Sequence, residues 1–375
     1  MGKVLFIFYL VKTVNNFTSR GWIFSHFKNL NNENFDFVIH EGTPNEDEGK
    51  SLKELLQLNR SKYKKIYLII GNPDRHNEKI NWIEIRKFVE KVILFPVDAI
   101  SVLGNFSKTI IKYADIVWCP HLQVIKELKK LNKPFLYLPY ASIFPKTIKS
   151  FEDRSDSLFF QGTAHGLRKS LIINLSNNSK INIKVQGNGW EINNKNKIIN
   201  NSIKKSINYY LNPPSEIFNK IIKSSFKNKY FLKSILNYPK RLINENVSIK
   251  NNNICIIPTY INENIDNYKF TLGINYLFSN EKHFSYRLRD FEAPAHGTCH
   301  LTQTDPNLEK IFLPNISMIY YRDKKDLIEI ANFYLNTKAG KKEARKIGLK
   351  AREVAKKNTW GKRLEEIYKY FEKNR

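Results

Sequence analysis

The chain has 375 residues, of which 42% are hydrophobic and 13% aromatic, with 62 Lys and Arg against 35 Asp and Glu. This length favours two domains, and the apolar content excludes a mainly disordered polyelectrolyte despite the net charge of +27. Cys119, Cys255 and Cys299 include no C-x-x-C pair, which excludes a disulfide framework and a cysteine-rich zinc module, so we expect a reducing compartment.

Short apolar runs alternate with longer mixed segments in the first part of the chain. The opening run, Val4 to Val11, is too short to span a bilayer and lacks a signal-peptide cleavage site, so we interpret it as a buried strand of a cytoplasmic protein. Further strands are predicted at 35–39, 65–70, 91–95, 115–119 and 135–138, and helical spacing occurs in 82–91 and 122–131. This alternation predicts a parallel, Rossmann-like α/β domain over residues 1–150.

A second series of the same kind follows a polar, charged stretch at 146–157, which has the composition of a linker. Strands are predicted at 157–161, 181–186, 254–257, 272–278, 298–302 and 317–321, and a long helical region at 324–373. We therefore expect a second Rossmann-like domain over residues 151–345, and a helical region at 346–375 that crosses back to the first domain.

A basic segment interrupts the second series as an insertion at about 192–250. Residues 203–243 contain eight Lys and one Arg against one Glu, with aromatic residues between them. Such a segment is suited to contact an anionic membrane surface. The alternative, equally open, is an insertion packed on the second domain with its lysines in water. An A/T-rich coding sequence could also inflate the lysine content without any selection for binding.

The stretch Tyr286 to Thr302 is the most informative in the chain. It contains the pattern Arg-x-Phe-Glu-x-x-Ala-x-Gly from Arg289 to Gly297, followed by a short strand that ends in Thr302. This pattern resembles the C-terminal signature of GT-B glycosyltransferases, in particular the spore-maturation or spore-coat glycosyltransferase-like branch. The stretches 114–120, 158–168 and 185–190 agree with the same family, so the resemblance covers roughly residues 110–372.

The resemblance implies a GT-B fold, in which two Rossmann-like domains face each other across a cleft, and a nucleoside-diphosphate sugar as donor. A diphosphate requires cationic or N–H donors, and a ribose requires a carboxylate acceptor. Arg289 and Glu292 supply these two chemistries, and Arg287 is a second phosphate candidate. The family also places donor contacts at the turn after the first strand of this domain, here Gly162, His165 and Arg168, and main-chain contacts to the base at the turn after the next strand, here Gly187 and Asn188. A purely structural turn is the open alternative at both places. Thr302, which ends the short strand after the pattern, is a further donor-binding candidate.

One feature departs from the family pattern. Many retaining GT-B enzymes carry a second glutamate eight positions before the one that matches Glu292, and here that position is Phe284. An inverting mechanism is therefore open, and it needs a general base on the acceptor side. Asp98 follows a predicted strand and is the first candidate, although it could equally cap a helix. Comparable positions are Asp74, His76, His40 and Glu41, and the segment 16–22 is expected to line the acceptor side.

No metal or cofactor is expected beyond the sugar nucleotide itself. His296, Cys299 and His300 are close in sequence, but a predicted helix-to-strand break at Gly297 would scatter them as ligands. There is no D-x-D motif, which agrees with GT-B enzymes, where basic residues usually replace the metal, and the resemblance implies a metal-independent, hexosyltransferase-like enzyme. The resemblance implies a glycan or glycolipid acceptor in cell-surface polysaccharide synthesis, at the inner face of the membrane.

Three rival functions stay open at this point. A sugar-nucleotide epimerase or hydrolase would share the donor residues, and a non-catalytic relative would bind the nucleotide without transfer. A basic nucleic-acid-binding protein would use the positive charge, but Lys and Arg are spread along the chain without a recognised motif, so no nucleic-acid partner is expected.

Overall fold

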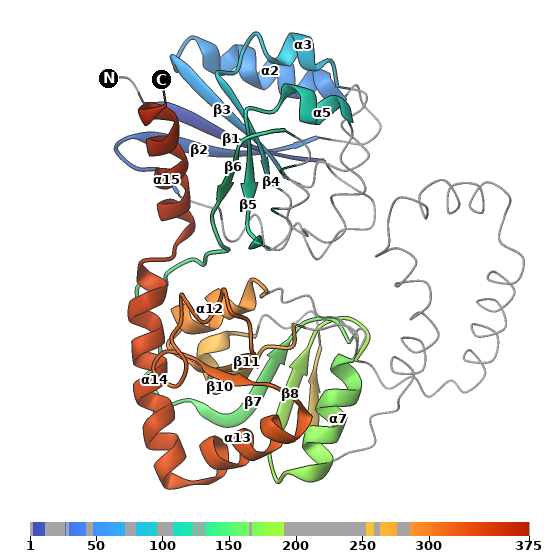
Figure 1. Ribbon diagram of the computed structural model, residues 1–375, viewed down its shortest axis with the longest axis vertical. Coiled ribbons are helices and arrows are strands. Elements are labelled where there is room, and N and C mark those ends of the chain that lie inside the picture. Colours follow the sequence, from blue (N-terminus) through green and yellow to red (C-terminus); the bar gives the residue numbers. More distant parts are fainter. Residues whose placement is uncertain are drawn as a thin grey trace, which may run out of the picture. The chain divides into compact units, whose positions relative to one another are not determined.

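The computed structural model describes residues 3–11, 30–42, 48–71, 80–95, 108–122, 132–164, 167–190, 253–258, 263–275 and 286–374, together with Phe27, Ile125 and Lys129. The chain divides into two compact units, one formed by Met1–Ile143 and Lys357–Arg375 and the other by Phe144–Lys356. Each unit is built on a parallel sheet with helices packed beside it (Figure 1). The predicted α/β architecture is therefore confirmed.

The first unit contains a six-stranded sheet in the order β2-β1-β3-β4-β5-β6, in which every neighbouring pair is parallel. Its strands are β1 (Val4–Val11), β2 (Phe35–Gly42), β3 (Lys65–Gly71), β4 (Lys91–Phe95), β5 (Ile116–Cys119) and β6 (Phe135–Tyr137). The helices α2 (Glu48–Arg60), α3 (Trp82–Ile85) and α5 (Lys108–Tyr113) belong to the same unit. Phe6 to Phe8 are fully buried, which explains the unbroken apolar run of β1.

The C-terminal helix α15 (Trp360–Lys373) belongs to the first unit although it is the last element of the chain. The buried Trp360 packs against Phe27, with 4.6 Å between ring centroids, and against Phe95 and Trp118. Nε of Arg363 donates to the carbonyl of Pro139 at 3.0 Å. The helix therefore completes the core of a unit whose other residues end near position 143.

The second unit contains a six-stranded parallel sheet in the order β12-β11-β10-β7-β8-β9. Its strands are β7 (Ser155–Gln161), β8 (Ile183–Gln186), β9 (Ile254–Ile257), β10 (Tyr268–Leu272), β11 (Cys299–Gln303) and β12 (Ile319–Tyr321). The helices are α7 (Arg168–Asn178), α12 (Arg289–Ala295), α13 (Lys324–Asn336) and α14 (Lys338–Lys356), with the short 3-10 helix η3 (Ile265–Asn267) before β10.

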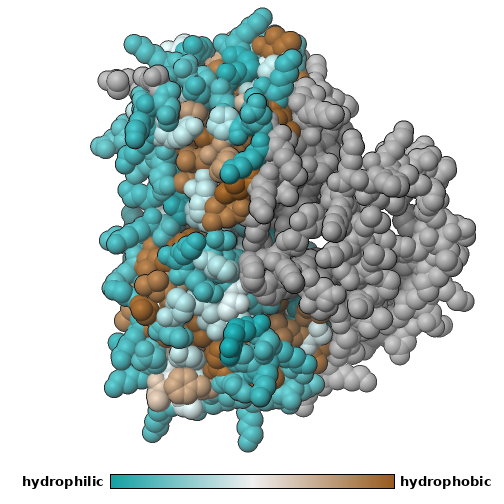
Figure 2. All heavy atoms as spheres, viewed as in Figure 1, coloured by the Kyte–Doolittle hydropathy of each residue, from teal (hydrophilic) through white to brown (hydrophobic). Residues whose placement is uncertain are grey.

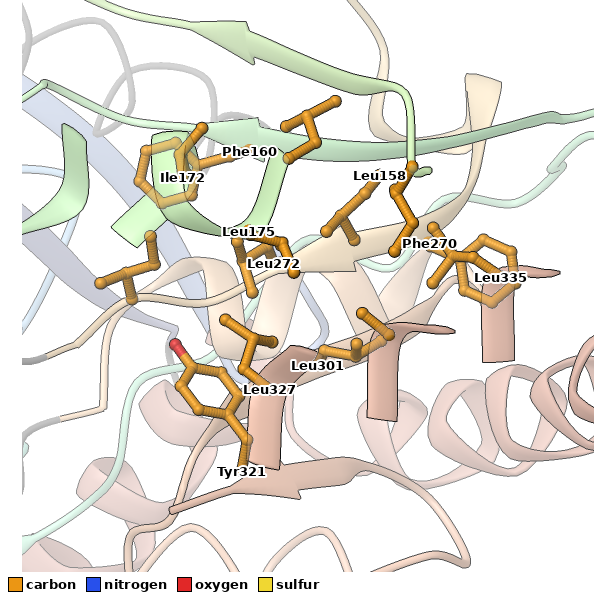
Figure 3. Packing of buried hydrophobic residues seen from close by; sticks show 14 of the residues in the cluster. Leu158, Phe160, Ile172, Leu175, Phe270, Leu272, Leu301, Tyr321, Leu327 and Leu335 are labelled. Atoms are coloured by element: carbon orange, nitrogen blue, oxygen red, sulfur yellow. The ribbon is translucent and has the colours of Figure 1, made fainter. Parts of the chain in front are cut away.

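Branched and aromatic side chains from strands and helices form the core of the second unit (Figure 3). Leu158 and Phe160 of β7 lie with Leu272 of β10 on one side of this core, and Leu327 and Leu335 of α13 close it. All five are at most 3% exposed. The core contains residues of β7, β10 and β11, and the same three strands position the site described below.

The structure differs from the sequence prediction in two places. The strand predicted at 272–278 is wrong, because β10 spans Tyr268–Leu272 and ends where that prediction begins. Its sequence mixes Lys269 and Thr271 with apolar residues, while the stretch after it is more continuously apolar. The helix predicted at 82–91 is shorter than expected, since α3 ends at Ile85 and β4 begins at Lys91.

Hydrophilic residues cover most of the visible described surface of each unit (Figure 2). No helix in the described part of the chain is long and apolar enough to cross a membrane. The predicted basic insertion at 192–250, including 203–243, lies outside the described residues.

Candidate functional site

Glycines and polar residues gather where the strands of the second sheet end. Because β7, β8, β10 and β11 are all parallel, their carboxyl ends meet at one edge of the sheet. Gly162 follows β7, Gly187 follows β8 and Gly273 follows β10. This is the edge at which open α/β sheets place their ligands.

Arg289, the first residue of α12, reaches this edge. Its guanidinium carbon lies 4.6 Å from the centroid of the Phe160 ring. Its Nη1 atom is buried and has no hydrogen-bond partner within the described ranges. Burial lowers the pKa of Arg289, and Arg287 lowers it further, while Asp290 and Glu292 act against both. The site therefore contains a cation with one buried hydrogen-bond donor, Nη1, that none of the described residues uses.

Gly162 makes room for this guanidinium. Its φ of +154° lies in a region that residues with a side chain rarely adopt, and a Cβ placed on it would lie 2.7 Å from Nη2 of Arg289. The N–H of Gly162 donates to the carbonyl of Gln186, and its own carbonyl accepts from Nε1 of Trp190 at 2.6 Å. The main-chain groups of Gly162 are thus engaged inside the protein, and its contribution to the site is space.

The turns after β7 and β8 fit closely against each other. Gly187 has a φ of +137°, and a Cβ on it would collide with the carbonyl of Gly162. Asn188 is exposed, and its carbonyl accepts from the N–H of Ala164 at 2.8 Å. Asn188 is therefore exposed to solvent at a turn whose main chain is hydrogen-bonded to Ala164.

A second guanidinium lies on the same aromatic ring. Arg168, at the start of α7, is buried, and its guanidinium carbon is 5.8 Å from the centroid of the Phe160 ring. Its Nη1 atom donates to the carbonyl and the hydroxyl of Thr163, both at 3.2 Å. Arg168 is thus committed to the turn after β7, whereas Arg289 reaches the same ring from α12.

Asp290, the residue after Arg289 in α12, is buried and accepts four hydrogen bonds. Its partners are Nε2 of His300, Oγ1 of Thr302, Nδ2 of Asn275 and the N–H of Arg287, at 2.6 to 3.0 Å. Burial acts to raise the pKa of Asp290, but His300, the N–H of Arg287 and the charge of Arg289 outweigh it and hold the pKa below its usual value. The carboxylate therefore stays ionised inside the protein.

Two further predicted donor residues lie in or beside α12. Glu292 is partly buried in the first turn, three residues after Arg289, and Arg287 is partly buried just before the helix. The structure thus brings Gly162, Arg168, Arg287, Arg289 and Glu292 to one part of the second unit.

Thr302 is fully buried, and its hydroxyl donates to Oδ1 of Asp290 at 2.8 Å. Its hydroxyl is therefore directed toward the interior of the protein, where it contacts Asp290 of α12. His165 and Asp98 lie outside the described residues, as do Asp74, His76 and the segment 16–22. His40 belongs to β2 of the first unit and its Nε2 lies 3.3 Å from the hydroxyl of Ser51, while Glu41 follows it in the same strand.

Sequence reasoning missed Asp290, His300 and Phe160. His300 had been considered only as a zinc ligand, but its Nε2 lies 2.8 Å from Asp290 and its Nδ1 lies 2.8 Å from Oγ1 of Thr271. Nowhere in the described ranges do three or more His, Cys, Asp or Glu side chains gather in a way that could hold a metal ion. The sequence contained one signal for Asp290, which is a charged residue between Arg289 and Phe291, two residues of the family pattern.

Residues 250–369, which include α12 and most of the described polar groups around it, match a family model described as "Glycosyl transferase-like". No curated protein matches the chain.

Solved structures match over the full length. HepE from Anabaena, solved in complex with UDP, superposes with a TM-score of 0.56 at 9% identity, covering 99% of this chain and 100% of HepE. A sucrose-phosphate synthase from Thermosynechococcus elongatus gives 0.55 at 10% identity, covering all of both chains. A glycosyltransferase from Rickettsia africae gives 0.55 at 13% identity, again covering all of both chains.

The chain has the GT-B fold. The resemblance to GT-B glycosyltransferases is thereby confirmed, in fold by the solved structures and in sequence by the match over residues 250–369. Assignment to the spore-coat branch stays a prediction. In this fold, the carboxyl edge of the second sheet is the donor side expected from the resemblance.

Proposed function

We propose that this GT-B chain is a glycosyltransferase that takes a sugar from a nucleoside-diphosphate sugar and transfers it to an acceptor hydroxyl. The observation that carries the proposal is the guanidinium of Arg289, whose Nη1 is buried without a hydrogen-bond partner in the described part of the chain. A buried donor left unpaired destabilises a protein by roughly 1–3 kcal/mol, and by more when the donor is charged. A ligand whose anionic oxygen accepts a hydrogen bond from Nη1 would remove this cost, which favours binding.

Each described donor residue has a role in this proposal. Arg289 binds the diphosphate, with Arg287 as a second cation, and their charge stabilises the nucleoside diphosphate as it leaves. Glu292 accepts hydrogen bonds from the ribose. Gly187 and Asn188 face the base at the turn after β8. Arg168 fixes the turn after β7, and Thr302 acts through Asp290.

The proposal also covers the general base, the donor sugar and the acceptor, although the residues expected to act on them lie outside the described part of the chain. A general base is required if the reaction inverts the anomeric carbon, and Asp98 is our candidate for it. We propose a hexosyl donor and a reaction that uses cationic side chains in place of a metal, with no cofactor besides the nucleotide sugar. The acceptor would be a cell-surface glycan or glycolipid, met at the inner face of the membrane with the help of residues 203–243.

A thermal-shift screen against UDP, GDP, CDP, ADP and dTDP tests the nucleotide site. A ligand that binds only the folded protein must raise its melting temperature, and we expect one of the five to do so. Arg289→Ala and Glu292→Ala should each weaken that nucleotide at least about tenfold, since a hydrogen bond to a charged group contributes about 1.5–3 kcal/mol.

Arg345→Ala is the matched control, because Arg345 carries the same charge in the same unit but is exposed and paired with Glu152 at 2.9 Å. It should leave the nucleotide shift unchanged. The absence of any shift with all five nucleotides, repeated in the presence of acceptor glycans, would contradict the proposal. Transfer itself is then measured as acceptor-dependent release of the same nucleoside diphosphate from its sugar conjugate.

A further inference from the structure

The carboxylate of Asp290 ties the beginning of α12 to two different strands. Oδ1 accepts from His300 and Thr302 of β11, each at 2.8 Å. Oδ2 accepts from Nδ2 of Asn275, three residues beyond the end of β10, at 3.0 Å. It also accepts from the N–H of Arg287 at 2.6 Å. One buried side chain therefore fixes the main chain from which Arg289 extends.

A second set of contacts supports Asp290 from behind. Nδ1 of His300 lies 2.8 Å from Oγ1 of Thr271, which lies 3.1 Å from Oγ1 of Thr298. Thr298 in turn donates to the carbonyl of Ala293 in α12 at 3.0 Å. These side chains therefore form a continuous series of polar contacts within hydrogen-bonding distance, from the first turn of α12 through β11 and β10 and back to α12.

None of these supporting groups can touch a ligand. Asp290 and Thr302 are fully buried, His300 is 1% exposed, and Thr271 and Asn275 are at most 4% exposed. They can therefore influence a bound nucleotide only without contact, through the position of α12 or through the charge of Asp290. This excludes a direct catalytic role and leaves a positioning role.

Among the residues that the structure describes, few contacts hold the side chain of Arg289. Its described contacts are the ring of Phe160 and the space above Gly162, neither of which supplies a hydrogen-bond acceptor to Nη1. A side chain with four rotatable torsions loses much of its entropy when it is fixed, so an unsupported arginine would bind phosphate poorly. The fixed main chain and the neighbouring negative charge of Asp290 both limit where the guanidinium can lie.

We propose that Asp290 is the positioning residue of the phosphate-binding Arg289, and that His300 holds Asp290 in the orientation this requires. The inference rests on the proposed nucleotide site and goes beyond it by assigning a function to a buried pair that contacts no ligand. A negative charge near an anion site lowers its affinity by simple electrostatics. If Asp290 favours phosphate binding, it must do so by fixing the position of Arg289. The proposal is therefore testable by removing the carboxylate of Asp290.

The experiment is a double-mutant cycle read out as the ratio of the dissociation constants for UMP and UDP. This ratio measures what the second phosphate contributes, and a general loss of folding does not change it. Calorimetric titrations are made on wild type, Arg289→Ala, Asp290→Asn and the double variant, below the melting temperature of each. If the screen identifies another base, the corresponding mono- and diphosphates are used.

We expect wild type to prefer UDP by at least about tenfold, and each single variant to reduce this preference to less than about threefold. The double variant should be no worse than Arg289→Ala alone, because both substitutions remove the same interaction. Preservation of the wild-type ratio in Asp290→Asn would overturn the inference, and so would losses that add independently in the double variant.

Two further variants protect the test against misfolding. Thr302→Val removes one donor to Asp290 at similar volume and should reduce the preference to an intermediate value. Asp266→Asn neutralises another buried carboxylate of the same unit, which accepts from the N–H of Lys149 at 3.4 Å, and should leave the ratio unchanged. If Asp266→Asn changed the ratio of dissociation constants as much as Asp290→Asn does, the inference would be wrong, because the loss would then follow from removing any buried charge.

His300 is tested by a conservative pair. Glutamine can still donate to Asp290 whereas leucine cannot, so His300→Gln should retain more of the preference for UDP than His300→Leu. Equal ratios in the two variants would contradict the role given to His300. Failure of the underlying function looks different, since wild type would then bind none of the nucleoside diphosphates before any variant is made.

Discussion

At the scale of single residues, the absence of a side chain at position 162 matters as much as the side chains around it. Gly162 was expected to let main chain approach a phosphate, but its N–H and carbonyl are both engaged by Gln186 and Trp190. What the glycine provides is space for the guanidinium of Arg289. The motif predicted a role for this position, and the three-dimensional contacts show that Gly162 lies against the guanidinium of Arg289.

Gly162→Ala should therefore impair nucleotide binding more than it impairs folding. The new methyl group would displace Arg289 from Phe160, and we expect the preference for a diphosphate over a monophosphate to fall at least about fivefold, with backbone strain of about 1–3 kcal/mol. Calorimetric titration and urea unfolding measure the two effects. Gly189→Ala is the control, because its φ of +82° is equally unfavourable but its Cβ would meet only Ala164, at 3.5 Å. Equal losses of preference in both variants would contradict this account.

The three cysteines differ in accessibility, and this predicts their reactivity. Burial raises the pKa of Cys119 to about 12, although a hydrogen bond to the carbonyl of His121 accompanies it, and burial also raises the pKa of Cys299. Cys255 is exposed. Because the thiolate is the reactive form, iodoacetamide at about pH 8 should label Cys255 alone in the folded protein and all three in urea. Mass spectrometry counts the labels, and rapid labelling of Cys119 without denaturant would contradict the buried placement.

At the scale of elements, α12 is short but is held from several sides. Besides the Asp290 contacts, it packs against α14 through a close approach of Gly348 to the turn after α12. A Cβ on Gly348 would lie 2.5 Å from the carbonyl oxygen of Gly297, whose φ is +68°. The glycine in α14 is therefore a packing requirement, despite the usual cost of glycine in a helix.

Gly348→Ala should accordingly destabilise the second unit by about 1–3 kcal/mol, opposite in sign to the gain of up to about 1 kcal/mol that alanine normally brings to a helix. The urea midpoint of the purified variant measures the change. Gly361→Ala in α15 is the matched helical control, since its Cβ would meet nothing closer than 4.0 Å, and it should be neutral or stabilising. A stabilised Gly348→Ala protein would show that α14 does not approach Gly297 this closely.

Most strands could be predicted from the sequence, because buried parallel strands are unbroken apolar runs and β1, β4 and β9 begin and end where the pattern places them. β10 could not, since it carries Lys269 and Thr271 within the sheet. In the site, Arg289 was identifiable from a family pattern. Asp290 and His300 were not, because their roles depend on contacts between residues ten positions apart in different elements, which local periodicity does not record.

At the scale of the whole molecule, the chain builds two units that are not simple halves of the sequence. The last residues, Lys357–Arg375, belong to the first unit, while the expected donor residues from Gly162 to Thr302 belong to the second. The two buried clusters formed by Leu5 to Cys119 and by Leu158 to Ile347 share no residue. A substitution in one core should therefore act mainly on its own unit.

Trp360→Ala tests this division. Trp360 is fully buried against Phe27, Phe95 and Trp118 of the first unit, and its removal should destabilise that unit by about 3–5 kcal/mol. The proposed nucleotide site consists of residues of the second unit, so the affinity for a nucleotide should change less than about twofold. Limited proteolysis should cleave within 1–143 first and leave a nucleotide-binding fragment that contains Arg289. If nucleotide binding were lost in parallel with the stability of the first unit, the site would depend on both units. Leu349→Ala, at an exposed position of α14, is the control for a neutral substitution.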